Sequence, residues 1–459
     1  MTLLKNTPFD ALTIGMEAEA EHLCVADDFY VFAHSSGNLN PMHLPKEDGD
    51  GDGRPEAVAP SAWVGALISS VLGNRLPGPG TMYESQNLNW TGRAHAGDVL
   101  VAKVTLTEKM DGNRVRFDTS VAIKGGATIL TGEAVVIAPT ELRSYDLHDI
   151  PGLRVQSHVH FDRLLQQAEP LPPIPTAVVA PEEANSLGGA ILGAEHTLIR
   201  PILVGSQAKI EAAAAEIGAD LSGYQIIDQP SHTEAAAMAV KLVHEGQANA
   251  LMKGHLHTDV LLSAVLKSGT GLRMGRRLSH VFVMDVPSLD HLLFVTDAAI
   301  NIAPDLETKV DIIQNAIDLA IALGIEVPKV GVLSAVETVN PKIPSTLDAA
   351  ILSKMADRGQ IRGGVVDGPL AMDNAVDITA ARIKGIKSAV AGHAEILVAP
   401  NLESGNMLAK ELTFLAGAEA GGIVLGARCP IILTSRSDDD KARLASCAVA
   451  ALYARKVPV

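Results

Sequence analysis

The chain is poor in cysteine, poor in long apolar runs and short of positive charge. Its three cysteines, Cys24, Cys429 and Cys447, have no spacing that indicates a zinc site or a redox pair. No stretch is apolar for long enough to span a bilayer or to form the core of a signal peptide. The formal net charge of −16 argues against a general nucleic-acid binder, because polyanion binding needs clustered lysine and arginine. We therefore expect a cytoplasmic protein that binds neither nucleic acid nor membrane.

The pattern of apolar residues changes near residue 150. Before it, helix-like segments at 29–34 and 62–72 precede three strand-like runs, which predicts an α+β domain. After residue 176, ten short apolar runs alternate with helix-like segments, which is typical of a mostly parallel sheet covered by helices. So many strands indicate two lobes with a cleft between them. We predict domains at residues 1–150 and 151–459.

The octet at residues 251–258 places a lysine, a glycine and a hydroxyl between an apolar run and a helix-like segment. Backbone N–H groups and the dipole of a helix that begins here would face an anion. Gly254 would let the backbone approach that anion, and Lys253 would add a point charge. An ordinary turn with a solvated lysine is the alternative.

The octet also contains two histidines, His255 and His257, which raise the question of a metal. They lie two positions apart and no third ligand follows at a matching spacing, so a structural or phosphate-contacting role is preferred. The glycines at 269–275 do not have the dinucleotide-binding spacing, and no Walker lysine motif occurs. We therefore predict no metal, no nicotinamide and no ATP.

Several motifs follow one another between residues 175 and 459. They are the octet, Arg276–Phe282, Val295–Ala298, Asp367–Pro369, Ser404–Asn406 and Leu433–Arg436. In this order and spacing they resemble the phosphate acetyltransferase and phosphate butyryltransferase family. The resemblance implies a two-lobed α/β enzyme of three layers, commonly an oligomer. Such an enzyme exchanges an acyl group between coenzyme A and inorganic phosphate, so acyl-CoA, CoA, phosphate and acyl phosphate would be its partners, with no cofactor.

This chemistry needs a site that holds phosphate, orients a thioester and stabilises a developing oxyanion. Thr258 and Lys253 of the octet would hold the phosphate. Arg276 or Arg277, together with Ser279, would complete the site, because arginine offers a planar bidentate fork. A solvated arginine pair before a strand is the alternative.

Ser435 and Arg436 follow the last apolar run, and ligands of open α/β sheets bind beyond the carboxyl ends of strands. The resemblance implies that Ser435 hydrogen-bonds the reacting centre and that Arg436 holds substrate. A helix N-cap is the alternative role for Ser435. Some family members use an acidic residue several positions later as a base for the thiol, but the run at 438–440 is arranged differently. We therefore expect acyl transfer without a dedicated base, because a thiol with a pKa of about 8.5 needs only modest help.

The segment Ser36–His43 resembles the hydration motif of MaoC-like (R)-specific enoyl-CoA hydratases, which have a hot-dog fold. In that family an aspartate and a histidine activate water. Here Asn38 stands at the aspartate position, and an amide cannot take the proton. Ser61 lies where the second catalytic element, His-Gly-Met, is expected. We predict a catalytically degenerate hot-dog domain that keeps His43 and serves assembly or acyl-CoA binding.

The sequence therefore predicts a phosphate acetyltransferase, with butyryl as the alternative acyl group. Two further alternatives are a bifunctional protein with residual hydratase activity and a non-catalytic module that senses acyl-CoA. The acidic repeat at residues 48–53 resembles a calcium loop, but the glutamate that closes such a loop is missing. A flexible acidic insert is the preferred interpretation.

Overall fold

The computed structural model describes residues 3–44, 57–146, 153, 155, 158–433 and 439–456. They form two compact units, one within Met1–Val155 and the other within Gln156–Val459. Each unit has its own sheet and its own hydrophobic core. The acidic repeat at 48–53 lies outside the described residues, so its interpretation stays a prediction.

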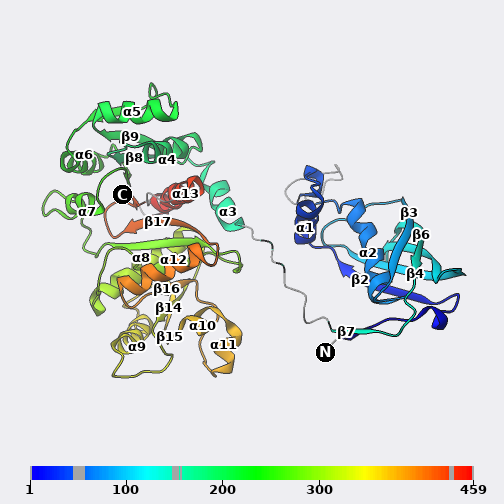
Figure 1. The fold of residues 1–459 in the computed structure, drawn as a ribbon. Coiled ribbons are helices and arrows are strands. Elements are labelled where there is room, and N and C mark those ends of the chain that lie inside the picture. Colours follow the sequence, from blue (N-terminus) through cyan, green and yellow to red (C-terminus); the bar gives the residue numbers. More distant parts are fainter. Residues whose placement is uncertain are drawn as a thin grey trace. The chain divides into compact units, whose positions relative to one another are not determined.

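In the N-terminal unit a helix packs into a curved antiparallel sheet (Figure 1). Helix α2 (Ser61–Asn74) buries Val64, Ile68 and Leu72, whose spacing places them on one side of the helix. The sheet has the order β2-β4-β5-β6-β3 and packs against this side. A helix wrapped by such a sheet is the hot-dog arrangement, so the predicted fold of this part is confirmed.

The structure contains the two helices and the three strands that the sequence predicts for this unit, and it adds further strands. The strands of its sheet are β2 (Glu17–Leu23), β3 (Met82–Trp90), β4 (Val99–Met110), β5 (Arg114–Ile123) and β6 (Thr128–Ile137). Around the sheet lie helix α1 (Ala26–Ser36) and a ribbon of β1 (Leu3–Lys5) and β7 (Ser144–Asp146). The unpredicted β2 and β3 are the edge strands, and most of their side chains are polar and exposed.

The C-terminal unit is built on one sheet of eleven strands (Figure 1). In sheet order these are β10 (Gln225–Asp228), β9 (Ile199–Gly205), β8 (Ile174–Val179), β11 (Ala250–Lys253), β18 (Ile431–Ile432), β17 (Glu419–Leu425), β12 (Ser279–Asp285), β13 (Leu293–Thr296), β16 (Ile396–Val398), β14 (Lys329–Leu333) and β15 (Val365–Leu370). The predicted mostly parallel sheet is confirmed, and β13 is the strand that the sequence analysis missed.

The direction of the strands reverses in the middle of this sheet. Strands β10, β9, β8, β11 and β18 are parallel to one another, and so are β13, β16, β14 and β15. Between these halves, β17 and β12 are antiparallel to each other and to their outer neighbours. The two parallel halves therefore run in opposite directions, and β18, with only two residues, joins the first half to the centre.

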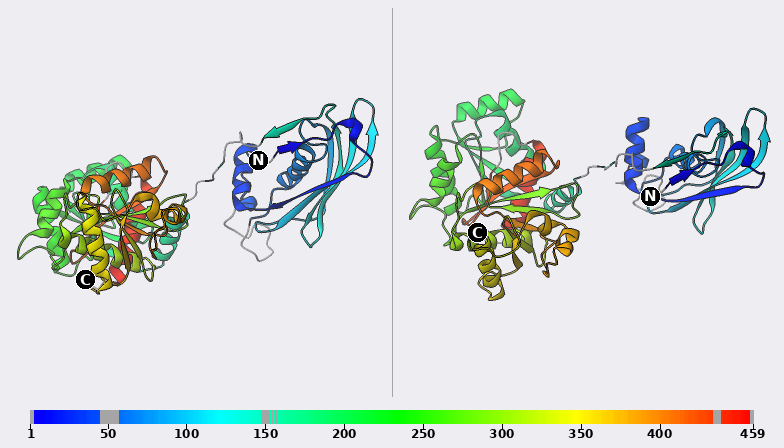
Figure 2. Two further views of the ribbon diagram at one scale, coloured as in Figure 1. Left: turned by 90° about the horizontal axis from the view of Figure 1, so that it is seen from below. Right: turned by 60° about the horizontal axis from the view of Figure 1, so that its bottom comes forward.

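Helices cover both faces of the sheet and make three layers, as Figure 2 shows from two further directions. On one face pack α3 (Val159–Ala168), α4 (Ala184–Glu195), α5 (Gln207–Ile217), α8 (Leu306–Ala322), α9 (Pro344–Asp357) and α13 (Asp440–Lys456). On the other face pack α6 (His232–His244), α7 (Thr258–Leu266), α10 (Met372–Val376), α11 (Ile378–Ile383) and α12 (Leu402–Phe414). The second group belongs to two separate cores, one with α6 and α7 and one with α10 to α12.

The three cysteines are free and buried, and burial raises the pKa of each thiol to about 12. They are therefore protonated and unreactive at neutral pH. Among the described residues, no helix combines the length and the apolar character that crossing a membrane requires.

Candidate active site

A cavity of about 780 Å³ lies between α7 and α12, on the face of the sheet where the two cores separate. It is lined by Lys253, Leu256, His257, Thr258, His280, Phe282, Ala299, Asn406, Ala409, Lys410, Thr413, Phe414, Gly417, Ala418, Glu419, Ala420, Leu433, Asp439 and Ala442. Of the predicted site residues, the structure thus brings Lys253, His257 and Thr258 together at one cavity.

The octet forms one wall of this cavity. Lys253 ends β11, and its Nζ donates to the carbonyl oxygens of Gly254 at 3.1 Å and Leu256 at 3.3 Å, which closes the turn. Helix α7 then begins at Thr258. The first N–H groups of a helix have no partner within it, and they carry the positive end of the helix dipole. The cavity is therefore bordered by a helix start whose N–H groups and dipole favour a negative charge.

Gly254 does not line the cavity. Its N–H donates to Val179 O at 2.8 Å, and an added Cβ would lie 2.5 Å from the same oxygen. The glycine is required because the octet packs directly onto the end of β8. Gly254 was predicted to face the anion, whereas the structure places it against a neighbouring strand.

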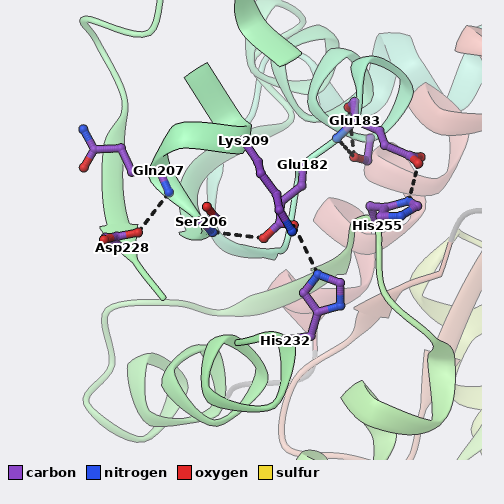
Figure 3. A network of polar contacts seen from close by, with 9 residues as sticks. Glu182, Glu183, Ser206, Gln207, Lys209, Asp228, His232 and His255 are labelled. Carbon is purple, nitrogen blue, oxygen red and sulfur yellow. Dashed lines mark hydrogen bonds and ion pairs between the residues drawn. The ribbon is translucent and has the colours of Figure 1, made fainter. Parts of the chain in front are cut away.

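His255 faces away from the cavity, into a network of polar contacts (Figure 3). Its Nδ1 lies 2.6 Å from Glu183 Oε1, although the contact lacks the direction of a hydrogen bond. The adjacent Glu182 accepts from Ser206 N at 3.0 Å, Lys209 Nζ at 3.0 Å and His232 Nε2 at 3.2 Å. Because His255 and His257 point to different surroundings, they do not form a joint metal site.

The Glu182 carboxylate is the centre of this network, and its side chain is only 1% exposed. Burial alone would raise the pKa of Glu182, but its three donors outweigh burial and hold the pKa below its usual value. The charged carboxylate thus connects the residues that follow β8, β9 and β10. Through the neighbouring Glu183 it also reaches the octet after β11.

The structure places Arg276, Arg277 and Ser279 away from the cavity. Arg276 Nη1 pairs with Asp318 Oδ2 at 2.5 Å, and the backbone N–H of Arg277 donates to a carboxylate on α8. Ser279 is fully buried, and its Oγ accepts from Asn315 Nδ2 at 2.9 Å. Side chains alternate along a strand, so β12 presents Ser279 to α8 and the next residue to the cavity.

That next residue, His280, is a site residue that the sequence analysis missed. Its ring stacks edge-to-face on Phe282, with 4.3 Å between ring centroids, and both line the cavity. Opposite them on β17, Gly422 leaves room for the imidazole, because a Cβ there would lie 2.9 Å from Nε2. Burial lowers the pKa of His280 to about 4, against the opposing effect of nearby Asp297, so the ring is neutral at pH 7.

Helix α12 forms the wall opposite the octet. Asn406 and Lys410 are four residues apart on its cavity face, and Asn406 Nδ2 donates to Ala298 O at 3.1 Å. Gly405 lets the helix approach closely, because a Cβ there would lie 2.5 Å from Asp297 O. From the sequence, Ser404–Asn406 was noted only as one of the motifs that resemble the family. The helical spacing after this motif was the signal that could have revealed Lys410.

Ser435 and Arg436 lie outside the described residues, which stop at 433 and resume at 439. Both flanks of this segment, Leu433 and Asp439, line the cavity. The roles of Ser435 and Arg436 stay predictions. Among the described residues, no group of three potential ligands could hold a metal ion.

The hydratase-like motif belongs to the N-terminal unit. Asn38 is exposed, and its Oδ1 accepts from Asn40 N at 3.3 Å. His43 ends a short turn of 3₁₀ helix, and its Nδ1 lies 2.8 Å from Val58 O. Ser61 begins α2, and its carbonyl accepts from Trp90 Nε1 at 3.1 Å. Asn38 stands at the position where the resemblance implies an aspartate, so the degenerate hydratase site stays a prediction.

An α/β unit whose cavity combines an anion-binding helix start with apolar walls has the features of a group-transfer enzyme. Comparisons with known proteins agree. The profile of the family described as "Phosphate acetyl/butaryl transferase" matches residues 231–451. The phosphate acetyltransferase of Rhizobium meliloti is 62% identical over 296 residues, which are 64% of this chain and 94% of that protein. The chain belongs to the phosphate acetyl/butyryltransferase family.

Further relatives extend this result. The phosphate butyryltransferase of Clostridium acetobutylicum is 48% identical over 253 residues, 55% of this chain and 84% of that protein. The branched-chain phosphotransacylase from Enterococcus faecalis V583 has a TM-score of 0.54 and 30% identity, covering 61% of this chain and 99% of its own. R-hydratase PhaJ1 from Pseudomonas aeruginosa has a TM-score of 0.32 and 34% identity, and the match covers 34% of this chain and 99% of that protein. The predicted family and the two-lobed α/β fold are confirmed.

Proposed function

We propose that this protein is a phosphate acetyltransferase, which converts acetyl-CoA and phosphate reversibly into acetyl phosphate and CoA. The observation that carries the proposal is the shared cavity, in which an anion-binding helix start faces apolar and aromatic side chains. The relative that is 62% identical is a phosphate acetyltransferase, whereas the butyryltransferase is 48% identical. Acetyl is therefore preferred to butyryl.

In the direction of acetyl-CoA synthesis, the CoA sulfur attacks the carbonyl carbon of acetyl phosphate. A carbon–sulfur bond forms, the bond from carbon to the bridging oxygen breaks, and the thiol proton leaves with the phosphate. Lys253, Thr258 and the first N–H groups of α7 stabilise the charge of the departing phosphate. Ser435 and Arg436 are the predicted contacts of the reacting carbonyl, and the flanks of their segment reach this cavity.

Arsenate tests this proposal against a protein that only senses acyl-CoA. Acetyl arsenate hydrolyses spontaneously, so a phosphate acetyltransferase releases CoA continuously from acetyl-CoA when arsenate replaces phosphate. We expect this release from the full chain. Binding of acetyl-CoA without any release of CoA would leave the sensing role instead.

The acyl group is tested by comparing kcat/KM for acetyl-, propionyl- and butyryl-CoA with phosphate. Two methylenes contribute only a few kcal/mol of apolar contact, about 1.6 at the usual value per CH₂. We expect the largest kcat/KM for acetyl-CoA. A larger value for butyryl-CoA would assign the protein to the butyryltransferases.

The proposal includes a reaction without a metal or an organic cofactor, because acyl transfer between phosphate and a thiol involves no net oxidation or reduction and Lys253 and the start of α7 supply positive charge for the phosphate. Dialysis against EDTA should leave kcat unchanged, and a loss that added Mg²⁺ restores would contradict it. We also propose a cytoplasmic homo-oligomer, and the buried free thiols fit a reducing compartment. Light scattering of the purified chain measures its oligomeric state.

A further inference from the structure

His280 is a buried polar residue in the wall of the cavity. It is only 1% exposed and still lines the cavity. Among the described residues its ring makes no hydrogen bond or ion pair. Buried polar groups nearly always have such a partner, so an imidazole without one at a cavity indicates a ligand that supplies it. Because Nδ1 is enclosed, Nε2 is the ring nitrogen that such a ligand can reach.

Two neighbours hold the imidazole in one orientation. Phe282 stacks on it with 70° between the two ring planes. Gly422 allows it to lie close, because a Cβ on this glycine would be 2.9 Å from the imidazole Nε2 and 2.7 Å from Leu433 O. Nε2 therefore lies beside the residue that follows β18. Leu433 is two positions before Ser435, the predicted contact of the reacting carbonyl, so the imidazole lies near the predicted reacting centre.

The chemistry of the ring favours a hydrogen-bond donor over a base. Burial lowers the pKa of His280 to about 4, against the opposing effect of Asp297, whereas a thiol has a pKa of about 8.5. A base so much weaker than the thiolate is unsuited to removing the thiol proton. A neutral imidazole carries one N–H, and with the proton on Nε2 this N–H faces the cavity. Such a donor suits an oxygen atom on which negative charge develops.

We propose that His280 is a catalytic residue whose Nε2–H donates to the carbonyl oxygen of the acetyl group. The assignment rests on the proposed acetyl transfer. When hydrogen phosphate attacks acetyl-CoA, a bond forms from a phosphate oxygen to the carbonyl carbon, and a carbonyl electron pair moves onto the carbonyl oxygen, where His280 stabilises it. The pair returns as the carbon–sulfur bond breaks, and the proton of hydrogen phosphate passes to the departing sulfur. His280 keeps its own proton throughout.

This role divides the cavity between two negative charges. Lys253 and Thr258 border the same cavity and are proposed to face the phosphate. His280 then serves the carbonyl oxygen, so each charge has its own partner. A donor that is fixed before the reaction begins stabilises the transition state more than the bound substrate, and its loss therefore lowers kcat rather than raising KM.

Three full-length variants test this role. His280→Phe fills a similar space without a donor, and we expect it to lower kcat about 100-fold while the KM for acetyl-CoA stays within about threefold of wild type. His280→Gln places an amide N–H near the position of Nε2 and should keep kcat within about tenfold of wild type. His393→Phe replaces an exposed histidine that does not line the cavity, so it is the matched control and should leave both constants unchanged.

A merely structural role of His280 would not produce this order, because phenylalanine suits a buried site better than glutamine does. Equal kcat values for His280→Phe and wild type, or equal losses for His280→Phe and His280→Gln, would overturn the assignment.

Infrared difference spectra of isotope-labelled acetyl-CoA report the hydrogen bond directly. They are recorded on the bound complex without phosphate, so that no acetyl transfer occurs. The carbonyl stretch should lie at a lower frequency in the wild type and His280→Gln than in His280→Phe, and the same frequency in all three would overturn the proposal. If the wild type bound acetyl-CoA but released no CoA with arsenate, the proposed function would fail by itself. The infrared frequencies would still decide whether His280 contacts the carbonyl.

Discussion

Gly254 sets how closely the octet packs on β8. An added Cβ would lie 2.5 Å from Val179 O and closer still to Ala180 O, and backbone atoms cannot rotate away. We expect Gly254→Ala to lower the free energy of unfolding by about 2 kcal/mol or more, as urea denaturation would measure. Gly223→Ala is the matched control, because a Cβ at Gly223 meets no atom within 4 Å. Equal stability of the two variants would contradict the packing argument.

His280 makes the protein sensitive to acid. Its buried Nδ1 has no hydrogen-bond partner among the described residues, and burial lowers its pKa from 6.5 to about 4. The unfolded chain therefore binds a proton that the folded chain refuses, so stability is lost as pH falls from 6.5 to 4 and is unaffected above that range. This group alone should remove about 3 kcal/mol at pH 4.

The measurement is urea denaturation at pH 7 and pH 4.5. His280→Asn should lose less stability than the wild type between these values, because its side chain does not titrate. His393→Asn replaces an exposed histidine and should keep the acid sensitivity of the wild type. If His280→Asn kept it as well, other groups would control the acid response.

At single positions, sequence reasoning located the octet but not the orientation of every side chain. Lys253, His257 and Thr258 could be found from the sequence because a turn between a strand and a helix can be recognised from composition alone. All three line the cavity. For the neighbours Ser279 and His280 the prediction chose the wrong side of the strand. Ser279 was expected at the cavity, but His280 is the residue that lines it. A run that is buried on both faces has no polar side to show which alternate residues face the ligand.

The Glu182 network is the feature that acts at the scale of elements. It connects the residues following β8 with the starts of α5 and α6, and Gln207 N adds a hydrogen bond to Asp228 Oδ1 at 3.0 Å (Figure 3). Replacing Glu182 by Gln keeps the shape of the side chain but removes the negative charge that Lys209 Nζ contacts at 3.0 Å. Lobe packing around the octet should loosen as a result.

We expect Glu182→Gln to lower the free energy of unfolding by about 1.5–3 kcal/mol at pH 7. Since the pKa of Glu182 is lowered in the folded chain, its contribution is present above pH 4.5, the ordinary value, and is lost as pH falls below it. The difference from wild type in urea melts should therefore diminish as pH falls below 4.5. A difference that stayed constant across this range would contradict a stabilising role for the charge of Glu182. Glu211→Gln, at an exposed position of α5, is the control.

The strands that sequence reasoning missed are of two kinds. The buried strands of the C-terminal sheet are short apolar runs, which are easy to recognise, but β2 and β3 are edge strands with mostly exposed polar residues. Strand β13 is buried and apolar, but it has only four residues. The order of strands along the chain does not give the direction in which each strand runs. The reversal of direction at β17 and β12 therefore had no signal in the sequence.

At the scale of the molecule, every described residue that lines the cavity lies between 253 and 442, inside the unit Gln156–Val459. We expect a fragment of residues 158–459 to keep the kcat of the full chain within a few-fold in the arsenate assay. The Rhizobium meliloti relative is covered to 94% by a match to only 64% of this chain, which supports this expectation. A fragment that folds, by circular dichroism, yet has no activity would show that the N-terminal unit contributes to catalysis.

The N-terminal unit leads to a separate expectation. Because Asn38 cannot take a proton from water, the full chain should hydrate crotonyl-CoA at less than about 1% of an ordinary hydratase rate. Asn38→Asp restores the missing carboxylate and His43→Ala serves as its control. Hydration by the unchanged chain at an ordinary rate would restore the bifunctional alternative.

Strand β18 has a mechanical consequence. Among the described residues, two residue pairs join β18 to β11 and two join it to β17, so the strand pairing of the sheet is short at this point. A sheet is expected to bend where the pairing of its strands is shortest, and β18 lies beneath the cavity between α7 and α12. Slow opening and closing of the lobes about this hinge would admit substrate and expel water, and relaxation dispersion at Ile431 and Ile432 would detect the motion.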